Sequence, residues 1–312
     1  MVSFERRFCF LGFLLVAVLQ GCTVNNDCAC PDLAGAGAGG SSGGSTTGGT
    51  AGAVTGGSGT GGAPLGPESA FSFFVTSLRA MRELSGNEDG FGGDLRFGET
   101  GPGAGLSGAD KICTQIAEKS APDNGKVWRA FLSVTQGADG VPVHAIERVG
   151  EGPWYDRRRR LVAQNLDDLA QMRPRGADPA IANDLPNEDG VPNHAPDPAA
   201  GNVDNHDTLT GSNETGHLFS QDAGFTCQDW TSAVGEAGRP RVGHSWTRAL
   251  GLPPGGGMVG MMMGENWMST LTESGCAPGA FIVEAGPPGA NGTRSVGDGG
   301  GYGGIYCLAL TP

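Results

Sequence analysis

The chain has 312 residues and a formal net charge of −13, and 57 of its residues are glycine. The excess of acidic side chains argues against nucleic acid as a partner and against electrostatic attachment to an anionic membrane surface. The length leaves room for one large domain or two small ones.

The first 22 residues form a targeting segment. A pair of arginines precedes an apolar stretch over residues 8–18, which is too short to cross a membrane as a helix. The stretch ends in Leu-Gln-Gly-Cys at Cys22, which resembles the cleavage site of a bacterial lipoprotein signal. That resemblance implies that residues 1–21 are removed and that Cys22 is lipidated. Because Thr23 rather than Asp follows it, it also implies the outer membrane, with contact to the bilayer through the lipid anchor only. The alternative is an ordinary secretory signal with an incidental cysteine.

A disordered tether is predicted over residues 22–67. Between residues 35 and 63 the chain is almost only Gly, Ala, Ser and Thr, which bury too little apolar area to offset the entropy of ordering. A flexible coil of about 29 residues spans roughly 30 Å, which suits a linker between a membrane and a domain. Cys28 and Cys30 lie at its start, and we favour a local or intermolecular disulfide over a metal tether.

The folded domain is predicted over residues 68–312. Aromatic and β-branched residues indicate a strand at residues 71–77. After a glycine-rich loop over residues 85–105, a capping-box-like sequence at Ser107 indicates the start of a helix. Five residues of this helix fall on one apolar stripe: Ala109, Ile112, Cys113, Ile116 and Ala117. We therefore expect Cys113 to point into the core.

Four further segments follow in the chain. Residues 126–134 predict a central strand, because both of its faces are largely apolar. Residues 149–163 predict a hairpin with the arginines at 157–160 in its turn. A segment near residues 165–205 is rich in Pro, Asp and Asn and predicts a long surface insert. Residues 208–213 predict a short strand and a turn.

The folded domain contains four cysteines, namely Cys113, Cys227, Cys276 and Cys307. In an exported domain, four cysteines spread this widely predict two disulfides. Four cysteines allow three pairings, and the sequence by itself leaves all three open.

Several short segments, in their order along the chain, resemble endostatin and the C-type-lectin-like fold to which endostatin belongs. They are residues 128–133 after a cysteine-bearing helix, residues 227–231 before a late cysteine, and residues 305–307 at the end. Bacterial exported lipoproteins with such a domain are similar over about residues 71–310, through segments such as 152–155, 209–212 and 243–245. The resemblance implies an α+β, C-type-lectin-like fold with two helices, antiparallel strands and a long loop region. It also implies nested disulfides, with Cys113–Cys307 outside and Cys227–Cys276 inside.

The calcium-dependent sugar site of C-type lectins is not expected in this chain. The triplets Glu-Pro-Asn, Gln-Pro-Asp and Trp-Asn-Asp are missing, and Glu265, Asn266 and Trp267 stand in a different order. Calcium takes about six to eight oxygen ligands, which one Glu-Asn pair does not supply. Three acidic clusters, at residues 87–89, 187–189 and 204–207, are interpreted as solvated loops; the alternative is a structural Ca²⁺ at one of them. No other cofactor or metal is assigned.

The histidines offer one catalytic hypothesis. His206-Asp207 and His244-Ser245 contain the residue types of a serine hydrolase, but the sequence around Ser245 lacks the final glycine of a nucleophile elbow. None of the histidines has the His-Glu-x-x-His spacing of a zinc protease. We therefore interpret His244 and Ser245 as residues bonded within a loop.

The preferred contact surface combines Trp246, Glu265, Asn266 and Trp267 with a methionine-rich loop at residues 258–268. Indole rings stack on sugar or peptide groups. The predicted function is a surface-anchored, non-enzymatic binding module for a glycan, a matrix component or a protein partner. One alternative is a structural envelope or matrix protein without a small ligand. Another is an enzyme on a lectin-like scaffold, as in formylglycine-generating relatives, which would need reactive late cysteines.

Overall fold

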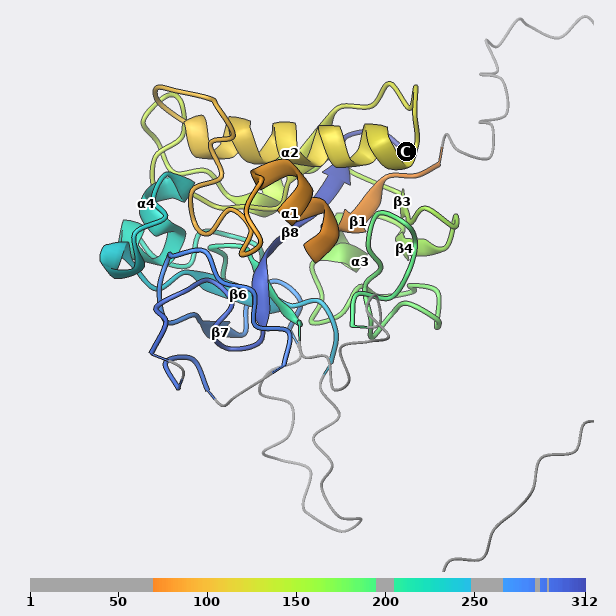
Figure 1. Ribbon diagram of the computed structural model, residues 1–312. Coiled ribbons are helices and arrows are strands. Elements are labelled where there is room, and N and C mark those ends of the chain that lie inside the picture. Colours follow the sequence, from red (N-terminus) through yellow and green to blue (C-terminus); the bar gives the residue numbers. More distant parts are fainter. Residues whose placement is uncertain (1–69, 195–204, 248–265, 284–286, 291) are drawn as a thin grey trace, which may run out of the picture. The chain divides into compact units, whose positions relative to one another are not determined.

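The computed structural model describes residues 70–194, 205–247, 266–283, 287–290 and 292–312 (Figure 1). All of them belong to the unit Thr60–Pro312. The targeting segment, the tether with Cys22, Cys28 and Cys30, and Glu265 lie outside the described residues, and what the sequence predicts for them stays a prediction. Within the described residues, no helix combines the length and the apolar character needed to cross a bilayer.

The described part of the domain mixes helices and strands, which confirms the predicted α+β class. In chain order the elements are β1 (Phe73–Val75), α1 (Leu78–Ser85), α2 (Ala104–Ser120), β2 (Trp128–Ala130), the 3-10 turn η1 (Ala145–Arg148), β3 (Trp154–Tyr155), β4 (Leu161–Ala163), α3 (Leu166–Leu169), β5 (Asp207–Leu209), η2 (Ala223–Thr226), α4 (Cys227–Trp230), η3 (Gly235–Ala237), β6 (Arg241–His244), β7 (Leu271–Thr272) and β8 (Gly301–Ala309). Long connections join most of these short elements.

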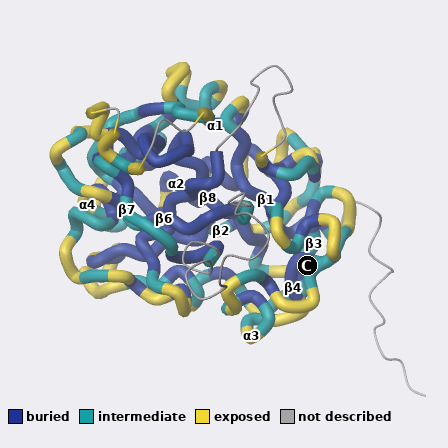
Figure 2. The backbone as a smooth tube through the Cα atoms, turned by 90° about the horizontal axis from the view of Figure 1, so that it is seen from below, coloured by how far each residue is buried: buried dark blue, intermediate teal, exposed yellow. Residues whose placement is uncertain are grey.

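Strand β8 is the centre of the main sheet, whose order is β1-β8-β5-β6-β7 with β2 also paired to β8. The second half of β8 pairs antiparallel with β1 and β2, and its first half pairs parallel with β5. The expected antiparallel pairing is found in the other described strand pairs, and the pair of β5 with β8 departs from it. All nine residues of β8 are buried, and the tube in Figure 2 shows the strand in the interior.

Both faces of this sheet are covered. Because side chains alternate between the two faces of a strand, β8 contributes residues to a core on each face. On β8, Ile305 and Cys307 belong to the core cluster that includes α2, whereas Tyr306 and Leu308 belong to a second cluster on the other face. The second cluster holds residues of β3, β4 and α3, including Trp154. Burial on both sides explains why β8 contains almost no polar side chain.

Helix α2 lies across β8 (Figure 1) and forms as predicted along its apolar stripe. All five stripe residues are buried, including Cys113. The helix begins at Ala104, one turn before the expected start. Gly103 stands at its N-terminal cap with a φ of 74°, and no side chain caps the helix there. Ser107 instead donates its hydroxyl to the carbonyl of Gly103, so the capping-box interpretation is wrong.

The two disulfides are nested, as the resemblance implies. Cys113 of α2 is bonded to Cys307 of β8, with 5.5 Å between their Cα atoms. Cys227 of α4 is bonded to Cys276, with 5.7 Å between their Cα atoms. The first bridge joins the long helix to the central strand, and the second closes the loops around β6 and β7.

Helix α1 was not anticipated, although its end signals are present in the sequence. The side chain of Ser77 accepts a hydrogen bond from the amide of Ala80, and Gly86 ends the helix with a φ of 67°. A serine before the first turn and a glycine after the last one are the usual boundaries of a short helix. The expected central strand over residues 126–134 is also shorter, because Ser133 leaves β8 and donates its amide to the carbonyl of Thr210. It is not central either, since β2 pairs with β8 alone.

The hairpin of β3 and β4 is confirmed, with the arginines in its turn. The turn is built around the fully buried Asp156, whose carboxylate accepts hydrogen bonds from the amides of Arg158 and Arg160. The segment near 165–205 differs from a purely surface insert. Its side chains Leu169, Ile181 and Leu185 are buried in the second core.

Candidate functional site

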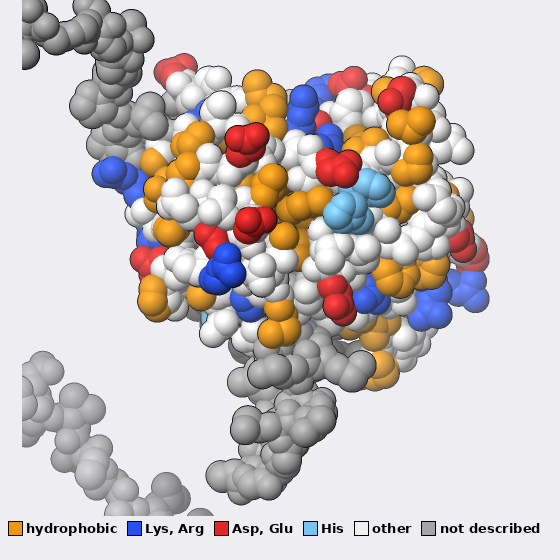
Figure 3. Space-filling model, turned by 180° about the vertical axis from the view of Figure 1, so that it is seen from behind, with side chains coloured by type: hydrophobic (Ala, Val, Ile, Leu, Met, Phe, Trp, Pro, Cys, Tyr) orange, Lys and Arg blue, Asp and Glu red, His pale blue; other side chains and the backbone are white. Residues whose placement is uncertain are grey.

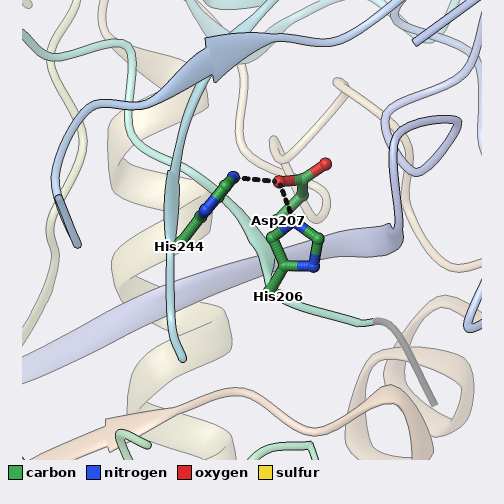
Figure 4. Close-up of side chains that lie close together, drawn as sticks. All are labelled: His206, Asp207 and His244. Atoms are coloured by element: carbon green, nitrogen blue, oxygen red, sulfur yellow. Dashed lines mark ion pairs between the residues drawn. The ribbon is translucent and has the colours of Figure 1, made fainter. Parts of the chain in front are cut away.

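A compact group of ionisable side chains lies at the start of β5 and the end of β6 (Figure 4). It consists of His206, Asp207 and His244. The Nε2 atom of His244 lies 3.0 Å from Oδ1 of Asp207, and Nε2 of His206 lies 3.5 Å from the same oxygen. One ligand atom from each residue lies within 4.8 Å of the other two. Within the described part of the chain, no other three His, Cys, Asp or Glu residues are grouped in this way.

Strand register brings these three residues together. Asp207 and His244 stand directly opposite each other in the antiparallel pair of β5 and β6, so their side chains share one face. His206 immediately precedes β5, and its carbonyl accepts a hydrogen bond from the amide of Ser245 at 2.8 Å. The two imidazole rings meet edge to face, with 4.1 Å between their centroids.

The glycine run before β8 allows its backbone to pass close to Asp207. A Cβ atom on Gly299 would lie 2.8 Å from Oδ2 of Asp207, and one on Gly301 would lie 3.0 Å from the Cβ atom of Asp207. Such separations leave no room for a side chain at either position. As a result Asp207 is 1% exposed, and His206 and His244 are 3% and 6% exposed.

A second buried carboxyl group, that of Glu273, lies next to this group. Its Oε2 atom accepts a hydrogen bond from the amide of Gly299 at 2.9 Å. Burial and then the negative charge of Asp207 raise the pKa of Glu273 well above its ordinary value. Burial also acts to raise the pKa of Asp207, but His206 and His244 outweigh it, and the pKa is lowered. The pKa values of the two carboxyl groups are thus shifted in opposite directions.

Polar atoms in this region are not all satisfied by protein hydrogen bonds. Neither carboxylate oxygen of Asp207 accepts a hydrogen bond of ordinary distance and angle from a described residue, and the same holds for Oε1 of Glu273. Most buried polar atoms in proteins do have such a partner, so the exceptions call for an explanation. An ion or a water molecule between these groups would supply one.

The strand that carries His244 is held from outside the sheet by Arg173. Its guanidinium group donates to the carbonyl oxygens of His244 at 2.6 Å, Ser245 at 2.9 Å and Ala182 at 3.0 Å. The insert that contains Arg173 thus fixes the backbone on one side of the cluster. This contact gives the loop-rich insert a role in positioning His244.

The catalytic hypothesis receives no support from the contacts of Ser245. The structure does bring His206, Asp207 and His244 together, as that hypothesis requires. The hydroxyl of Ser245, however, donates to the carbonyl of His206 and accepts from the side-chain amide of Asn193 at 3.0 Å. Ser245 is fully buried, and these contacts agree with a serine bonded within the structure.

The expected contact surface has to be corrected at Trp267, which is fully buried. Its indole nitrogen donates to the carbonyl oxygens of Leu169 and Gln171, and its ring lies 4.7 Å from the ring of Phe131. Asn266 supports the turn before β7, because its side-chain oxygen accepts from two main-chain amides. Both residues belong to the framework of the domain.

Trp246 is the member of that set whose position still suits contact with a ligand. It is partly exposed, and its indole nitrogen donates to the side chain of Asn205 at 3.1 Å. Its ring lies 5.3 Å from that of His206 and 5.2 Å from that of His194. Trp246 therefore lies beside His206, at the edge of the cluster, and does not form a platform with the buried Trp267.

Of the acidic clusters interpreted as solvated loops, those at residues 87–89 and 187–189 form hydrogen-bonded turns. The interpretation as solvated is wrong at 187–189, where Asn187 and Glu188 are buried, and in the described part of 204–207, which is buried at the start of β5. The side chain of Asn87 accepts from the amide of Asp89, and the side chain of Asn187 accepts from the amides of Asp189 and Val191. Glu188 is buried and accepts from Ser77 at the start of α1. The contacts of Asn87 and Asn187 lie within their own turns, and that of Glu188 joins its turn to the start of α1.

Two open grooves flank the loop that follows Cys227. The first, called the Asp229 groove, has a volume of about 490 Å³. Glycine and apolar residues make up most of its lining, and its polar side chains are Gln136, Asp139, Gln228, Asp229 and Thr231. The second, called the Arg294 groove, also has a volume of about 490 Å³ and is lined by residues that include Glu236, Arg239, Ser274 and Arg294. On the face in Figure 3, acidic, basic and hydrophobic side chains are interspersed across the described surface.

The Asp229 groove has an unusual wall. Cys227, Gln228, Asp229 and Trp230 all have positive φ angles, between 48° and 62°. A left-handed conformation costs roughly 1–2 kcal/mol for each residue that is not glycine. The carboxylate of Asp229 offsets part of this cost, since it accepts hydrogen bonds from the amide and hydroxyl of Thr135. Sequence reasoning missed this turn.

No family model matches the chain, and no curated protein matches it.

Proposed function

We propose that the protein is a lipid-anchored, non-enzymatic binding module of the bacterial outer membrane, with a C-type-lectin-like domain that binds a glycan. The α+β architecture and the two nested disulfides support the lectin-like domain, because both are what the resemblance implies. The lipoprotein-type signal ending at Cys22 and the tether after it support the anchor.

The observation that carries the proposal is the wall of the Asp229 groove. Gln228 and Asp229, which line the groove, belong to a run of four consecutive residues in the strained left-handed conformation, and Cys227–Cys276 holds that run at one end. Strained backbone persists only where the surrounding structure enforces it, and it is concentrated at ligand-binding and catalytic sites. A volume of about 490 Å³ lies within the range of small-molecule sites.

The lining of this groove suits hydroxyl groups. Gln136 and Gln228 offer amide donors and acceptors, and Asp139 offers a carboxylate acceptor. Sugar hydroxyls can both donate and accept, so a neutral glycan matches this lining. Trp246 lies elsewhere, beside His206, and is not part of this groove.

A glycan and matrix-protein array, probed with the purified full-length chain with and without Ca²⁺, tests the proposal. We expect a glycan ligand to bind. Its affinity should fall about tenfold in Gln136→Ala, because the substitution removes one hydrogen bond to the ligand. The matched control is Gln221→Ala, which removes another exposed glutamine that does not line the groove. A protein ligand, or no ligand at all, would overturn the glycan assignment, and the second result would favour a structural envelope protein.

The anchor is tested separately by labelling cells with a radioactive fatty acid. We expect the label on the full-length chain and none on Cys22→Ala, which would remain unprocessed. Label on the variant would contradict the assignment of Cys22.

A further inference from the structure

We propose that His206, Asp207 and His244 bind a divalent transition-metal cation of the zinc class. The donors are two imidazole nitrogens and one carboxylate oxygen. This set is typical of zinc sites that keep one position open, whereas calcium and magnesium prefer oxygen ligands alone. The proposal rests on this geometry and stands independently of the glycan assignment.

The distances between the donor atoms fit such a site. In a tetrahedral zinc site with metal–ligand bonds of about 2.05 Å, neighbouring ligand atoms lie about 3.3 Å apart. The separations from Oδ1 of Asp207 to His244 Nε2 and His206 Nε2 are 3.0 Å and 3.5 Å, on either side of that value. All three donor atoms lie within 4.8 Å of one another.

The burial of Asp207 is the second observation that points to a ligand. Its two oxygens are buried and accept no hydrogen bond of ordinary geometry from a described residue. A buried carboxylate is costly unless a charge and hydrogen bonds compensate for it. The imidazoles of His206 and His244 supply part of that compensation, and a divalent cation on Oδ1 would complete it.

The surroundings hold the three donors in place. Asp207 and His244 lie on paired strands rather than on loops, and such positions are held more precisely. Gly299 and Gly301 let the backbone close against Asp207, and Arg173 holds the carbonyl of His244. The two imidazole rings retain a slight exposure, which gives an ion a route to the site.

Metal titration of the full-length chain tests the site. After treatment with a chelator, the chain is titrated with Zn²⁺ and Co²⁺, the latter followed by visible absorption. We expect one equivalent bound, with the ligand-field bands of a tetrahedral cobalt site. His206→Gln and His244→Gln should each weaken binding by more than about 100-fold, beyond the effect of losing an outer-shell partner.

The chain offers a matched control in its second pair of histidines. His144 and His217 have ring centroids 4.8 Å apart, and His217 lies 3.8 Å from Glu147. We expect binding to be unchanged in His144→Gln combined with His217→Gln. It should also be unchanged in Cys28→Ser combined with Cys30→Ser, which removes the two thiols of the tether.

Several results of these titrations would overturn the proposal. A chain without stoichiometric binding of Zn²⁺ or Co²⁺ would overturn the proposal, and so would binding that is lost in the control variants and kept in His206→Gln. If a histidine variant fails to fold, the nearly isosteric Asp207→Asn replaces it. Binding of undiminished affinity in folded Asp207→Asn would also overturn the proposal.

Discussion

Loss of the outer disulfide should destabilise the domain more than loss of the inner one. The perturbation is Cys113→Ala combined with Cys307→Ala, compared with Cys227→Ala combined with Cys276→Ala. All four half-cystines are fully buried, so the packing lost at the two bridges is similar. Alanine is used because a serine hydroxyl would be buried without a partner.

The difference comes from the length of chain that each bridge closes. The outer bridge joins residues 194 positions apart, and the inner bridge joins residues 49 positions apart. By the chain-entropy relation, these loops correspond to about 5 kcal/mol and about 4 kcal/mol of stabilisation. The outer pair of substitutions should therefore lower the free energy of unfolding by about 1 kcal/mol more than the inner pair.

Urea unfolding of the three full-length proteins, followed by circular dichroism, measures these losses. The dependence on urea should also steepen in both variants, because the unfolded chain without a cross-link exposes more surface. A larger loss in the inner variant than in the outer one would refute the reasoning, and so would a loss below about 1 kcal/mol in both, far under the usual range.

Three further predictions concern buried side chains. Trp267→Ala should lower the free energy of unfolding by about 3–5 kcal/mol, because the ring is fully buried. Trp246→Ala should lower it by less, because that position is partly exposed. Urea unfolding of the two variants makes the comparison. Asp110→Asn should lower the free energy of unfolding by about 3–5 kcal/mol in the same assay, since it leaves the largely buried Arg148 without its ion pair. A decrease below about 1 kcal/mol would contradict this prediction. Burial raises the pKa of Glu188, so the stabilisation from this group is full below its unfolded pKa and is lost as the pH rises. As the pH rises above the unfolded pKa of Glu188, the unfolding free energy of Glu188→Gln should therefore increase relative to that of the parent chain. Urea unfolding at a series of pH values measures this, and the same pH dependence in both proteins would contradict it.

The periodic elements of the fold could be predicted from the sequence. The apolar stripe of α2 places Cys113 on the buried face of the helix, because a helical period of 3.6 residues brings the stripe residues onto one face. This prediction needs only the local sequence. The hairpin around Asp156 follows from two short apolar runs and a polar turn. The resemblance implied the disulfide pairing, which spacing by itself leaves open.

The arrangement of the site could not be predicted, because it depends on register between distant segments. The sequence shows that His206, Asp207 and His244 are of residue types that could form a site. Only the pairing of β5 with β6 places Asp207 opposite His244. Burial of Trp267 was missed for a related reason. Its partners, Phe131 and the carbonyl of Leu169, come from segments far away in the chain.

Anomalous diffraction at the zinc absorption edge, from crystals of the full-length chain grown with Zn²⁺, tests the central claim most directly. We predict one strong peak that lies about 2 Å from Nε2 of His206, Oδ1 of Asp207 and Nε2 of His244. A peak at His144 and His217 instead, or a zinc-saturated crystal without a peak between the three residues, would contradict the account.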